Sequence, residues 1–400
     1  MQCAQKNLRT RVSVILSVYN GEKYLRSAID SVLKQTVFPE IEFLCMDDGS
    51  TDASSSILSD IAEKDSRVRL FRQTNRGLGA ARTRLLEEAG GDYLMFLDAD
   101  DKLASGDVLA HGYDQAVSDD LDVLISAGAQ MTKSGKVLHK AYISPELIPV
   151  KRVFAPAELG NALFLLSYSG VCGKLFRRQF IQDNGFVFPP VRRSEDFPFL
   201  EMVLASAKRI GVMDSPFFLR RLGTGVSMED RKDDLPLTFF ESEAILRQEL
   251  KRRGLDSRFE TAVDVVSVVR LWYNFNTMRT YEGAKAVFDK AKQGIGAKYT
   301  AFFDSSINHA GYVSSWQNVK VLCESPSAGA YYFQKYHEVE KEICALKSSE
   351  AYRVGMFVTW PLRKAWGGVK CLRENGVKYT VKHAVGKVLR LFGWYRATCL

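Results

Sequence analysis

No uninterrupted apolar run in this 400-residue sequence approaches the ~20 residues that a membrane-spanning helix needs. The first residues, MQCAQKNLRT, also lack the apolar stretch of a secretory signal. Cysteines are few and scattered, and no pair of them has the spacing of a zinc or thiol-exchange motif (Cys3, Cys45, Cys172, Cys323, Cys344, Cys371 and Cys399). We therefore expect a cytoplasmic protein with reduced cysteines and no spanning helix.

Net positive charge is absent from most of the chain. Residues 347–400 hold eleven Lys or Arg against two acidic residues, whereas residues 1–346 hold 44 basic and 45 acidic residues. A neutral body argues against a nucleic-acid partner. After Pro361, apolar residues recur at helical spacing beside Lys and Arg, with Trp394 near the end. This pattern predicts that residues 347–400 contact an anionic membrane surface, the alternative being that their apolar stripe packs on the protein itself.

Internal repeats and low-complexity linkers are also absent, and strand-like runs instead alternate with helical patterns. β-branched runs at 12–19, 41–46, 68–71 and 93–97 are separated by segments with helical spacing of apolar residues. They predict an α/β fold with a mostly parallel central sheet flanked by helices. Residues 121–127 are expected to continue the sheet, and a late pair of strands is expected around 210–219. Beyond residue 231 the pattern is helical, and Trp272, Tyr273 and Phe275 are expected in the core, the alternative being an acceptor platform.

The hexapeptide DDGSTD, residues 47–52, follows the second predicted strand. Open α/β sheets bind ligands at the carboxyl ends of their strands. A carboxylate there can accept the N3 proton of a uracil or thymine ring, so Asp48 is a candidate for base selection. The alternative is an Asx-turn in which Asp52 is the N-cap of the next helix.

The run DADD, residues 98–101, follows the fourth predicted strand. Asp98 and Asp100 are spaced so that they could share a hard cation, and Mg²⁺ and Mn²⁺ prefer such oxygen ligands. Acidic groups this close repel one another unless a cation or solvent compensates. A solvated acidic turn is the alternative.

Two further segments carry candidate site residues. Asp196, in RRSEDFPFL, precedes an apolar helix and is a candidate general base, unless it and Glu195 only cap that helix. Gly77-x-Gly79 in NRGLGAAR is a partial match to a dinucleotide motif, but Arg82 occupies the third glycine position. We expect this segment to approach a nucleotide with Arg82 near the diphosphate. A tight turn with a surface arginine is the alternative.

Four segments together resemble one family. VSVILSVYNGEKYL, DDGSTD, NRGLGAARTRLLEEAGGDYLMFLDADD and RSEDFPF follow the order and strand context of the family 2 glycosyltransferases of the GT-A fold, over residues 10–230. The resemblance implies a nucleotide-sugar site with Ser17, Tyr19 and Asp48. It also implies an Mg²⁺ or Mn²⁺ site at Asp98 and Asp100, and a catalytic base at Asp196.

Other positions carry weaker signals or depart from the family pattern. GKLFRRQFI and LRRLGTGVS resemble family segments near the base and the donor phosphates, which makes Lys174 and Arg221 site candidates and brings in Ser227. Ser17 stands where proline is frequent, and Thr83 where asparagine is usual. The QxxRW motif of processive synthases is missing, so transfer of single sugars is expected.

The resemblance implies an inverting transfer from a nucleotide diphosphate donor, with UDP-sugar favoured, to a glycan or lipid-linked acceptor in cell-surface polysaccharide synthesis. A noncatalytic nucleotide-sugar-binding or scaffold protein of the same fold is the alternative, and a nucleotidyltransferase is disfavoured because no GxGTR loop occurs. The expected organisation is a catalytic domain at 10–230, a helical accessory region at 231–346 and the basic tail at 347–400. We expect the protein at the inner face of the cell membrane.

Overall fold

The computed structural model describes residues 10–35, 40–138, 142–224, 232–295 and 310–332, with 334, 335, 338 and 341. The chain divides into two compact units, Met1–Glu324 and Ser325–Leu400. In the second unit the described residues include a helical stretch at 328–332. The predicted membrane-contact helices of residues 347–400 lie outside the described residues, and the domain boundaries expected at 230 and 346 stay predictions.

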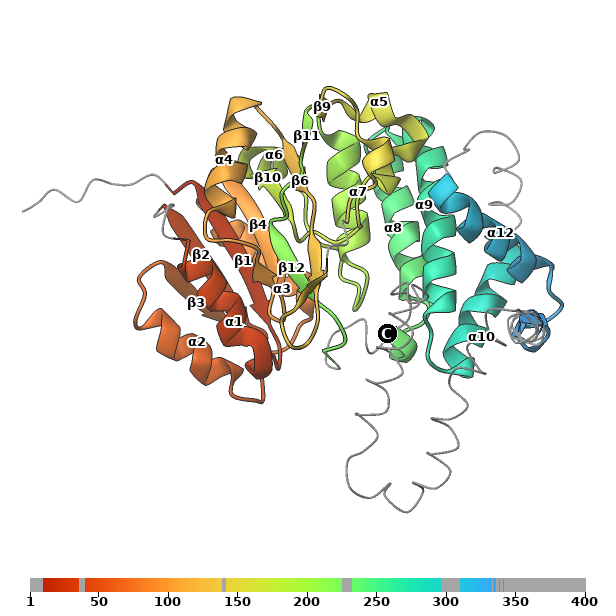
Figure 1. Cartoon of the computed structure of the whole chain (residues 1–400), viewed down its shortest axis with the longest axis horizontal. Coiled ribbons are helices and arrows are strands. Elements are labelled where there is room, and N and C mark those ends of the chain that lie inside the picture. Colours follow the sequence, from red (N-terminus) through yellow and green to blue (C-terminus); the bar gives the residue numbers. More distant parts are fainter. Residues whose placement is uncertain are drawn as a thin grey trace, which may run out of the picture. The chain divides into compact units, whose positions relative to one another are not determined.

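The first unit is built on an eight-stranded sheet with the order β3-β2-β1-β4-β10-β6-β11-β9 (Figure 1). Strands β3, β2, β1 and β4 run parallel, whereas β10 is antiparallel to both of its neighbours. The expected strands of this sheet are confirmed to within a residue or two (β1 Val12–Val18, β2 Ile41–Asp47, β3 Val68–Arg72, β4 Tyr93–Asp98, β6 Val123–Ser126, β11 Ile210–Met213). The sequence analysis did not predict the two other strands, β9 (Val153–Phe154) and β10 (Lys174–Arg177). The mixed α/β architecture that the sequence predicts is therefore confirmed.

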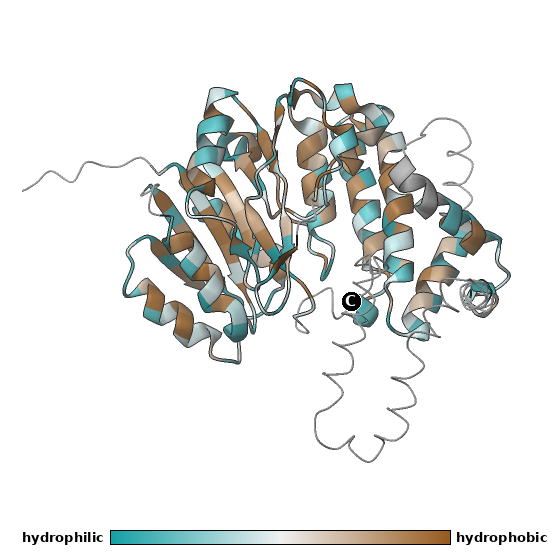
Figure 2. Cartoon of the chain, viewed as in Figure 1, coloured by the Kyte–Doolittle hydropathy of each residue, from teal (hydrophilic) through white to brown (hydrophobic). Residues whose placement is uncertain are grey.

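Helices cover both faces of this sheet. One apolar cluster joins the sheet to α1 (Glu22–Leu33), α2 (Ser54–Ala62) and α4 (Val108–Ser118). The other joins it to α3 (Leu78–Glu88), α6 (Arg178–Asp183), α7 (Asp196–Ser206), α8 (Thr238–Arg252) and α9 (Asp256–Asn276). In Figure 2 the central strands are mainly apolar, as expected for strands buried on both faces.

The late strand pair expected around 210–219 forms, but its two strands belong to different sheets. β11 continues the large sheet, whereas β12 (Phe218–Arg221) joins a small sheet of order β5-β12-β7-β8 (β5 Lys102–Leu103, β7 Ala129–Met131, β8 Val137–Leu138). Because β5 directly follows the acidic run 98–101, the small sheet holds that run against β12.

The helices after residue 231 pack beside the sheet. α7 contacts α8, α8 contacts α9, and α9 contacts α10 (Tyr281–Lys290), α12 (Ala310–Glu324) and the 3-10 helix η2 (Gly160–Leu165). Phe275 is buried as expected, but Tyr273 is 45% exposed, so the expectation that it lies in the core is wrong. None of the helices in the described part of the chain combines the length and the apolar character that a bilayer crossing needs.

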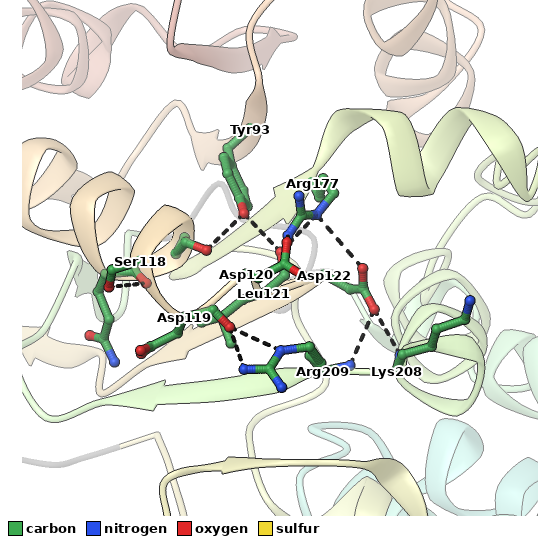
Figure 3. A network of polar contacts seen from close by, with 11 residues as sticks. Tyr93, Ser118, Asp119, Asp120, Leu121, Asp122, Arg177, Lys208 and Arg209 are labelled. Carbon is green, nitrogen blue, oxygen red and sulfur yellow. Dashed lines mark hydrogen bonds and ion pairs between the residues drawn. The ribbon is translucent and has the colours of Figure 1, made fainter.

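A polar network fastens the amino-terminal edge of the parallel strands (Figure 3). The Tyr93 hydroxyl donates to the carbonyls of Ala116 and Leu121 at 2.9 and 2.8 Å. Arg177 Nε donates to the same Leu121 carbonyl at 3.1 Å, and Arg209 donates to the Asp119 carbonyl at 3.0 and 2.6 Å. These bonds tie the segment between α4 and β6 to β4, β10 and β11, and leave the carboxyl edge of the sheet for the loops that carry the candidate site.

Candidate active site

The loops after β1, β2 and β4 meet at one edge of the sheet. β1 lies between β2 and β4, and Ser17 pairs with both Met46 and Asp98. The candidates Ser17, Tyr19, Asp48 and Asp98 are therefore brought to the same edge, as the sequence predicts. The Tyr19 side chain is 50% exposed there. The Ser17 hydroxyl is buried and has no hydrogen-bond partner among the described residues.

The β1–α1 and β2–α2 loops are held together by hydrogen bonds from both sides. Asn20 Oδ1 accepts from the Thr51 amide at 2.8 Å, and the Gly21 amide donates to Ser54 Oγ at 2.9 Å. Asp52 accepts from the Ser54 amide at 2.9 Å and from the Glu22 amide at 3.1 Å. The N-cap position of α2 is Ala53, so the N-cap expected at Asp52 is one residue early, and Asp52 instead links the two loops.

Asp48 fastens the loop that leads into α3. Its carboxylate is 3% exposed and accepts from Gln73 Nε2 at 2.7 Å and from the amides of Arg76 and Gly77 at 2.9 Å. Gly77 has φ = 89°, a backbone conformation that favours glycine. Selection of a uracil ring by Asp48 stays a prediction, and in the structure this carboxylate orders the Gly-rich loop.

Asp98, Asp100 and Asp101 form an acidic cluster whose carboxylate oxygens lie within 4.8 Å of one another. Burial, and then the charge of Asp98, raise the pKa of Asp100 to about 6. The same causes raise the pKa of Asp101, which is 3% exposed and accepts from the Arg221 amide at 2.8 Å. Three hard oxygen donors that repel one another fit a divalent cation such as Mg²⁺ or Mn²⁺. Asp98 and Asp100 are less buried than Asp101 and are better placed to ligate it.

Asp196 begins helix α7, and its carboxylate faces the segment before β10. Asp196 Oδ2 accepts from the Val171 amide at 3.4 Å. Burial raises the pKa of Asp196, while the neighbouring Arg82 charge lowers it. Glu195 is the N-cap residue but makes no capping hydrogen bond with its side chain. Helix capping alone therefore does not account for this acidic pair.

Arg82 joins the acidic cluster to the candidate base. Its guanidinium is almost fully buried, donates to Asp98 Oδ1 at 2.8 Å and to Glu195 Oε1 at 3.0 Å, and forms a short contact with Asp196 Oδ1. Burial lowers the pKa of Arg82, but the three carboxylates raise it further, so Arg82 stays charged. Burial and Asp196 raise the pKa of Glu195 to about 7. Arg82 was expected near a diphosphate, and the structure places it among carboxylates.

Gly79 explains how α3 brings Arg82 there. A Cβ atom on Gly79 would lie 3.0 Å from the Pro189 carbonyl oxygen and 3.4 Å from the Glu195 side chain. The glycine thus lets α3 approach the segment that carries the base. The sequence predicts that the backbone approaches a nucleotide at this point. In the structure the close approach of Gly79 is to residues 189–195 instead.

The two weaker cationic candidates, Lys174 and Arg221, donate hydrogen bonds to backbone carbonyls. Lys174 is 3% exposed and donates to the carbonyls of Tyr168 and Gly170 at 3.0 and 2.7 Å, and burial lowers its pKa to about 8. Arg221 Nε donates to the Asp100 carbonyl at 3.1 Å, and its guanidinium stacks on Tyr24 at 4.5 Å. Lys174 therefore shapes the loop beside the base, and Arg221 holds the backbone of the acidic run. Ser227 lies outside the described residues.

The sequence interpretation missed Arg220, the neighbour of Arg221 on β12. Its guanidinium lies 5.1 Å from the centre of the Tyr168 ring, on the side of the strand opposite to Arg221. The sequence could have indicated Arg220 through the two-residue period of a strand. Adjacent side chains on a strand point to opposite faces, so only one of two neighbouring arginines can face the site.

The mostly parallel α/β sheet thus gathers acidic residues, with a candidate divalent-cation site, at the carboxyl edge where open α/β sheets bind ligands. Residues 13–184 match the family described as "Glycosyl transferase family 2". Residues 13–184 are thus similar to the family 2 glycosyltransferases, and they lie in a mixed α/β fold with a large central sheet.

Similar proteins cover parts of the chain. The "Uncharacterized glycosyltransferase EpsJ" of Bacillus subtilis is 30% identical over 52% of this chain and 60% of its own length. An "Uncharacterized glycosyltransferase" of Haemophilus influenzae is 50% identical over 24% of this chain and 38% of its own length. S. aureus TarS 1–349 in complex with UDP-GlcNAc aligns at 20% identity over 78% of this chain and 90% of that chain, with a TM-score of 0.46. The chain thus spans less than two thirds of the length of these two curated relatives.

Proposed function

We propose that this protein is an inverting glycosyltransferase that moves one sugar from a nucleotide diphosphate donor, with UDP-sugar favoured, to an acceptor hydroxyl. The observation that carries the proposal is the buried Arg82, which holds Asp98 of the acidic cluster and Asp196 of α7 on one guanidinium. It brings a candidate metal site and a candidate base together at the edge of the sheet where ligands bind in this class of fold.

Each group has a role in this reaction. Asp196 removes the proton of the acceptor hydroxyl, whose oxygen forms a bond to the anomeric carbon while the bond from that carbon to the diphosphate oxygen breaks. A single displacement from the opposite face inverts the anomeric configuration. Asp98 and Asp100 would hold Mg²⁺ or Mn²⁺, which stabilises the negative charge of the leaving diphosphate. Arg82 keeps the Asp196 carboxylate oriented, and its charge keeps the pKa of Asp196 from rising further.

The remaining candidate residues have roles in the proposed reaction as well. Ser17, Tyr19 and Asp48 surround the nucleotide through the first two loops, and Arg220 is better placed than Arg221 to face the donor phosphates. Lys174 acts on the loop that donates to Asp196. We further propose that the acceptor is a glycan or a lipid-linked glycan at the inner face of the cell membrane, as the basic tail suggests.

Turnover of nucleotide sugars tests the proposal. The full chain would be incubated with Mg²⁺ or Mn²⁺ and a panel of UDP-sugars, and UDP and pyrophosphate would be measured separately. Slow release of UDP without pyrophosphate supports glycosyl transfer. Pyrophosphate release would instead indicate a nucleotidyltransferase, and donor binding with no turnover under any metal or acceptor would favour a noncatalytic binding protein.

Two substitutions separate the roles of metal site and base. Asp196→Asn is expected to lower turnover by ~10²–10⁴-fold while donor binding is kept, because the amide cannot accept the hydroxyl proton. Asp100→Ala is expected to abolish metal-dependent turnover with the fold intact. Asp114→Asn, an exposed aspartate on α4, is the control and should behave as the parent. Loss of UDP binding in Asp196→Asn as severe as the loss of turnover would contradict the assignment of the base.

A further inference from the structure

Tyr168 stands on the loop that contacts the candidate base. The loop bends at Gly170, where a Cβ atom would lie 2.2 Å from the Tyr168 ring, and Val171 then donates its amide to Asp196. Lys174 holds this loop through the carbonyls of Tyr168 and Gly170. The Tyr168 side chain is nevertheless 42% exposed, and its ring contacts Tyr142 at 5.4 Å between centroids. The loop geometry therefore presents an aromatic ring to solvent three residues from the amide that binds the base.

Tyr273 reaches the same neighbourhood from helix α9. On the preceding turn of α9 the Arg270 guanidinium lies 4.0 Å from the centre of the Phe197 ring, and Phe197 directly follows Asp196. The next residue, Asn274, accepts from Arg193 at 3.3 Å, two residues before Glu195. These contacts fasten the last turns of α9 to the segment that carries the base. Tyr273 lies between them along the helix, and its side chain is 45% exposed.

Cations accompany both rings. Arg220 lies 5.1 Å from the Tyr168 ring centre, and Lys232 Nζ lies 5.2 Å from the Tyr273 ring centre. Tyr168 interacts electrostatically with the candidate base Asp196, with Asp98 of the acidic cluster and with Tyr273, so the two rings and both candidate sites are near one another.

We propose that Tyr168 and Tyr273 form an acceptor subsite that binds a pyranose ring by stacking. This inference rests on the proposed function, since it needs a base at Asp196 that receives an acceptor hydroxyl. The C–H faces of a sugar ring are apolar and pack on the electron-rich face of an aromatic ring, while the ring hydroxyls point outward toward polar groups. The acceptor class is therefore a carbohydrate.

Saturation-transfer NMR on the full chain, with UDP and Mg²⁺ and also without them, tests the subsite. The probes are the methyl glycosides of glucose, galactose, mannose and N-acetylglucosamine. At least one of them is expected to receive saturation from the protein. Tyr168→Ala and Tyr273→Ala should each weaken its binding about 3- to 10-fold, in line with the loss of one aromatic contact. Tyr168→Phe and Tyr273→Phe should keep it, since the ring remains.

Controls separate this test from folding and from the proposed function. Tyr281→Ala, an exposed tyrosine at the start of α10, should bind the probe as the parent does. Tyr168→Leu keeps apolar bulk without a ring, and should lose binding even if the alanine variant does not fold. UDP affinity, measured by calorimetry, should be the same in all variants. No saturation of any methyl glycoside, or saturation equal to the parent's in both the leucine and the alanine variants, overturns the subsite. A parent that binds glycosides but not UDP contradicts the proposed function alone.

Discussion

The Arg82 guanidinium is buried, and its burial explains why it is paired with carboxylates. A buried guanidinium is strongly disfavoured unless it is paired, and here three carboxylates from β4 and the start of α7 surround it. Its ring neighbours Phe96 and Phe188 lie 5.9 and 5.4 Å from the guanidinium carbon and keep water away from it. Arginine suits this place better than lysine because its planar fork presents separate nitrogens to separate acceptors.

At this position Arg82→Lys is expected to lower turnover by roughly 10²-fold, because one ammonium cannot orient Asp98 and Asp196 together. Since the Arg82 charge lowers the pKa of Asp196, a weaker contact should raise that pKa. More of the base is then protonated at a given pH, so the acid limb of the kcat/KM profile should move to higher pH. The pH dependence of turnover measures both effects.

Arg84→Lys, an exposed substitution on the same helix, is the matched control and should leave rate and profile unchanged. If Arg82→Lys lowered kcat but left the acid limb in place, Arg82 would act on packing rather than on the base.

At the scale of helices and strands, α7, α9 and β10 share a second buried cluster of ionisable groups, formed by Glu201, Arg270 and Lys174. Glu201 on α7 is 1% exposed. Burial raises its pKa to about 8, while Arg270 on α9 and Lys174 on β10 lower it. Three elements that frame the site thus meet at one carboxyl group, which is mostly protonated at neutral pH.

This arrangement predicts how stability depends on pH. Between the ordinary value of 4.5 and about 8, the folded chain keeps the Glu201 proton and the unfolded chain loses it. Stability should therefore fall across this window as pH rises. Glu201→Gln imitates the protonated form, so urea unfolding should show the variant close to the parent at pH 5 and more stable at pH 8.5, by on the order of a few kcal/mol.

Burial lowers the pKa of Lys174 to about 8, so Lys174 changes the pH dependence of stability only above about pH 8. It does not oppose the effect of Glu201 below that pH. Glu241→Gln, an exposed glutamate on α8, should show no such pH-dependent difference. A Glu201→Gln variant that loses stability equally at both pH values would mean that the carboxyl is ionised and paired in the folded protein.

At the scale of the whole molecule, the charge is divided unequally along the chain. Residues 1–346 are close to neutral, and the excess of basic residues lies in 347–400. Each basic residue near an anionic leaflet contributes about 1 kcal/mol to binding. A tail that docks the catalytic unit on a membrane would present a lipid-linked acceptor to Asp196.

Sedimentation with anionic vesicles tests this docking. The full chain is expected to pellet with the vesicles and to be released by salt, whereas a chain ending at Ser348 should stay in the supernatant. A full-length variant with Lys378, Lys382 and Lys387 changed to Gln should bind more weakly and serves as the charge control. Equal sedimentation of the full and shortened chains would show that the tail does not hold the protein on the membrane.

Much of the architecture follows from local pattern. β-branched runs bounded by polar turns predict the strands of the parallel sheet, and the carboxyl ends of neighbouring parallel strands share an edge. That rule is enough to place Asp48 and Asp98 together, because it depends on chain direction and not on any particular contact. The motif order also predicts a base at Asp196, which stays a prediction. The resemblance to the family, which the same motifs carry, is supported by the match over residues 13–184.

Only the tertiary structure decided the partners of the charged and aromatic groups. Arg82 contacts Asp98, 16 residues away, and Asp196, 114 residues away, and no local period specifies such a pairing. Lys174, Arg220 and Arg221 all carry a cationic side chain on or next to a strand, yet their partners differ. Lys174 binds loop carbonyls, Arg220 faces Tyr168, and Arg221 binds the backbone of the acidic run. Tyr273 was assigned to the core because it lies in an aromatic cluster on an apolar helix. The packing of α9 against the segment before α7 leaves it exposed, since a helical pattern gives the face of a residue but not what that face meets.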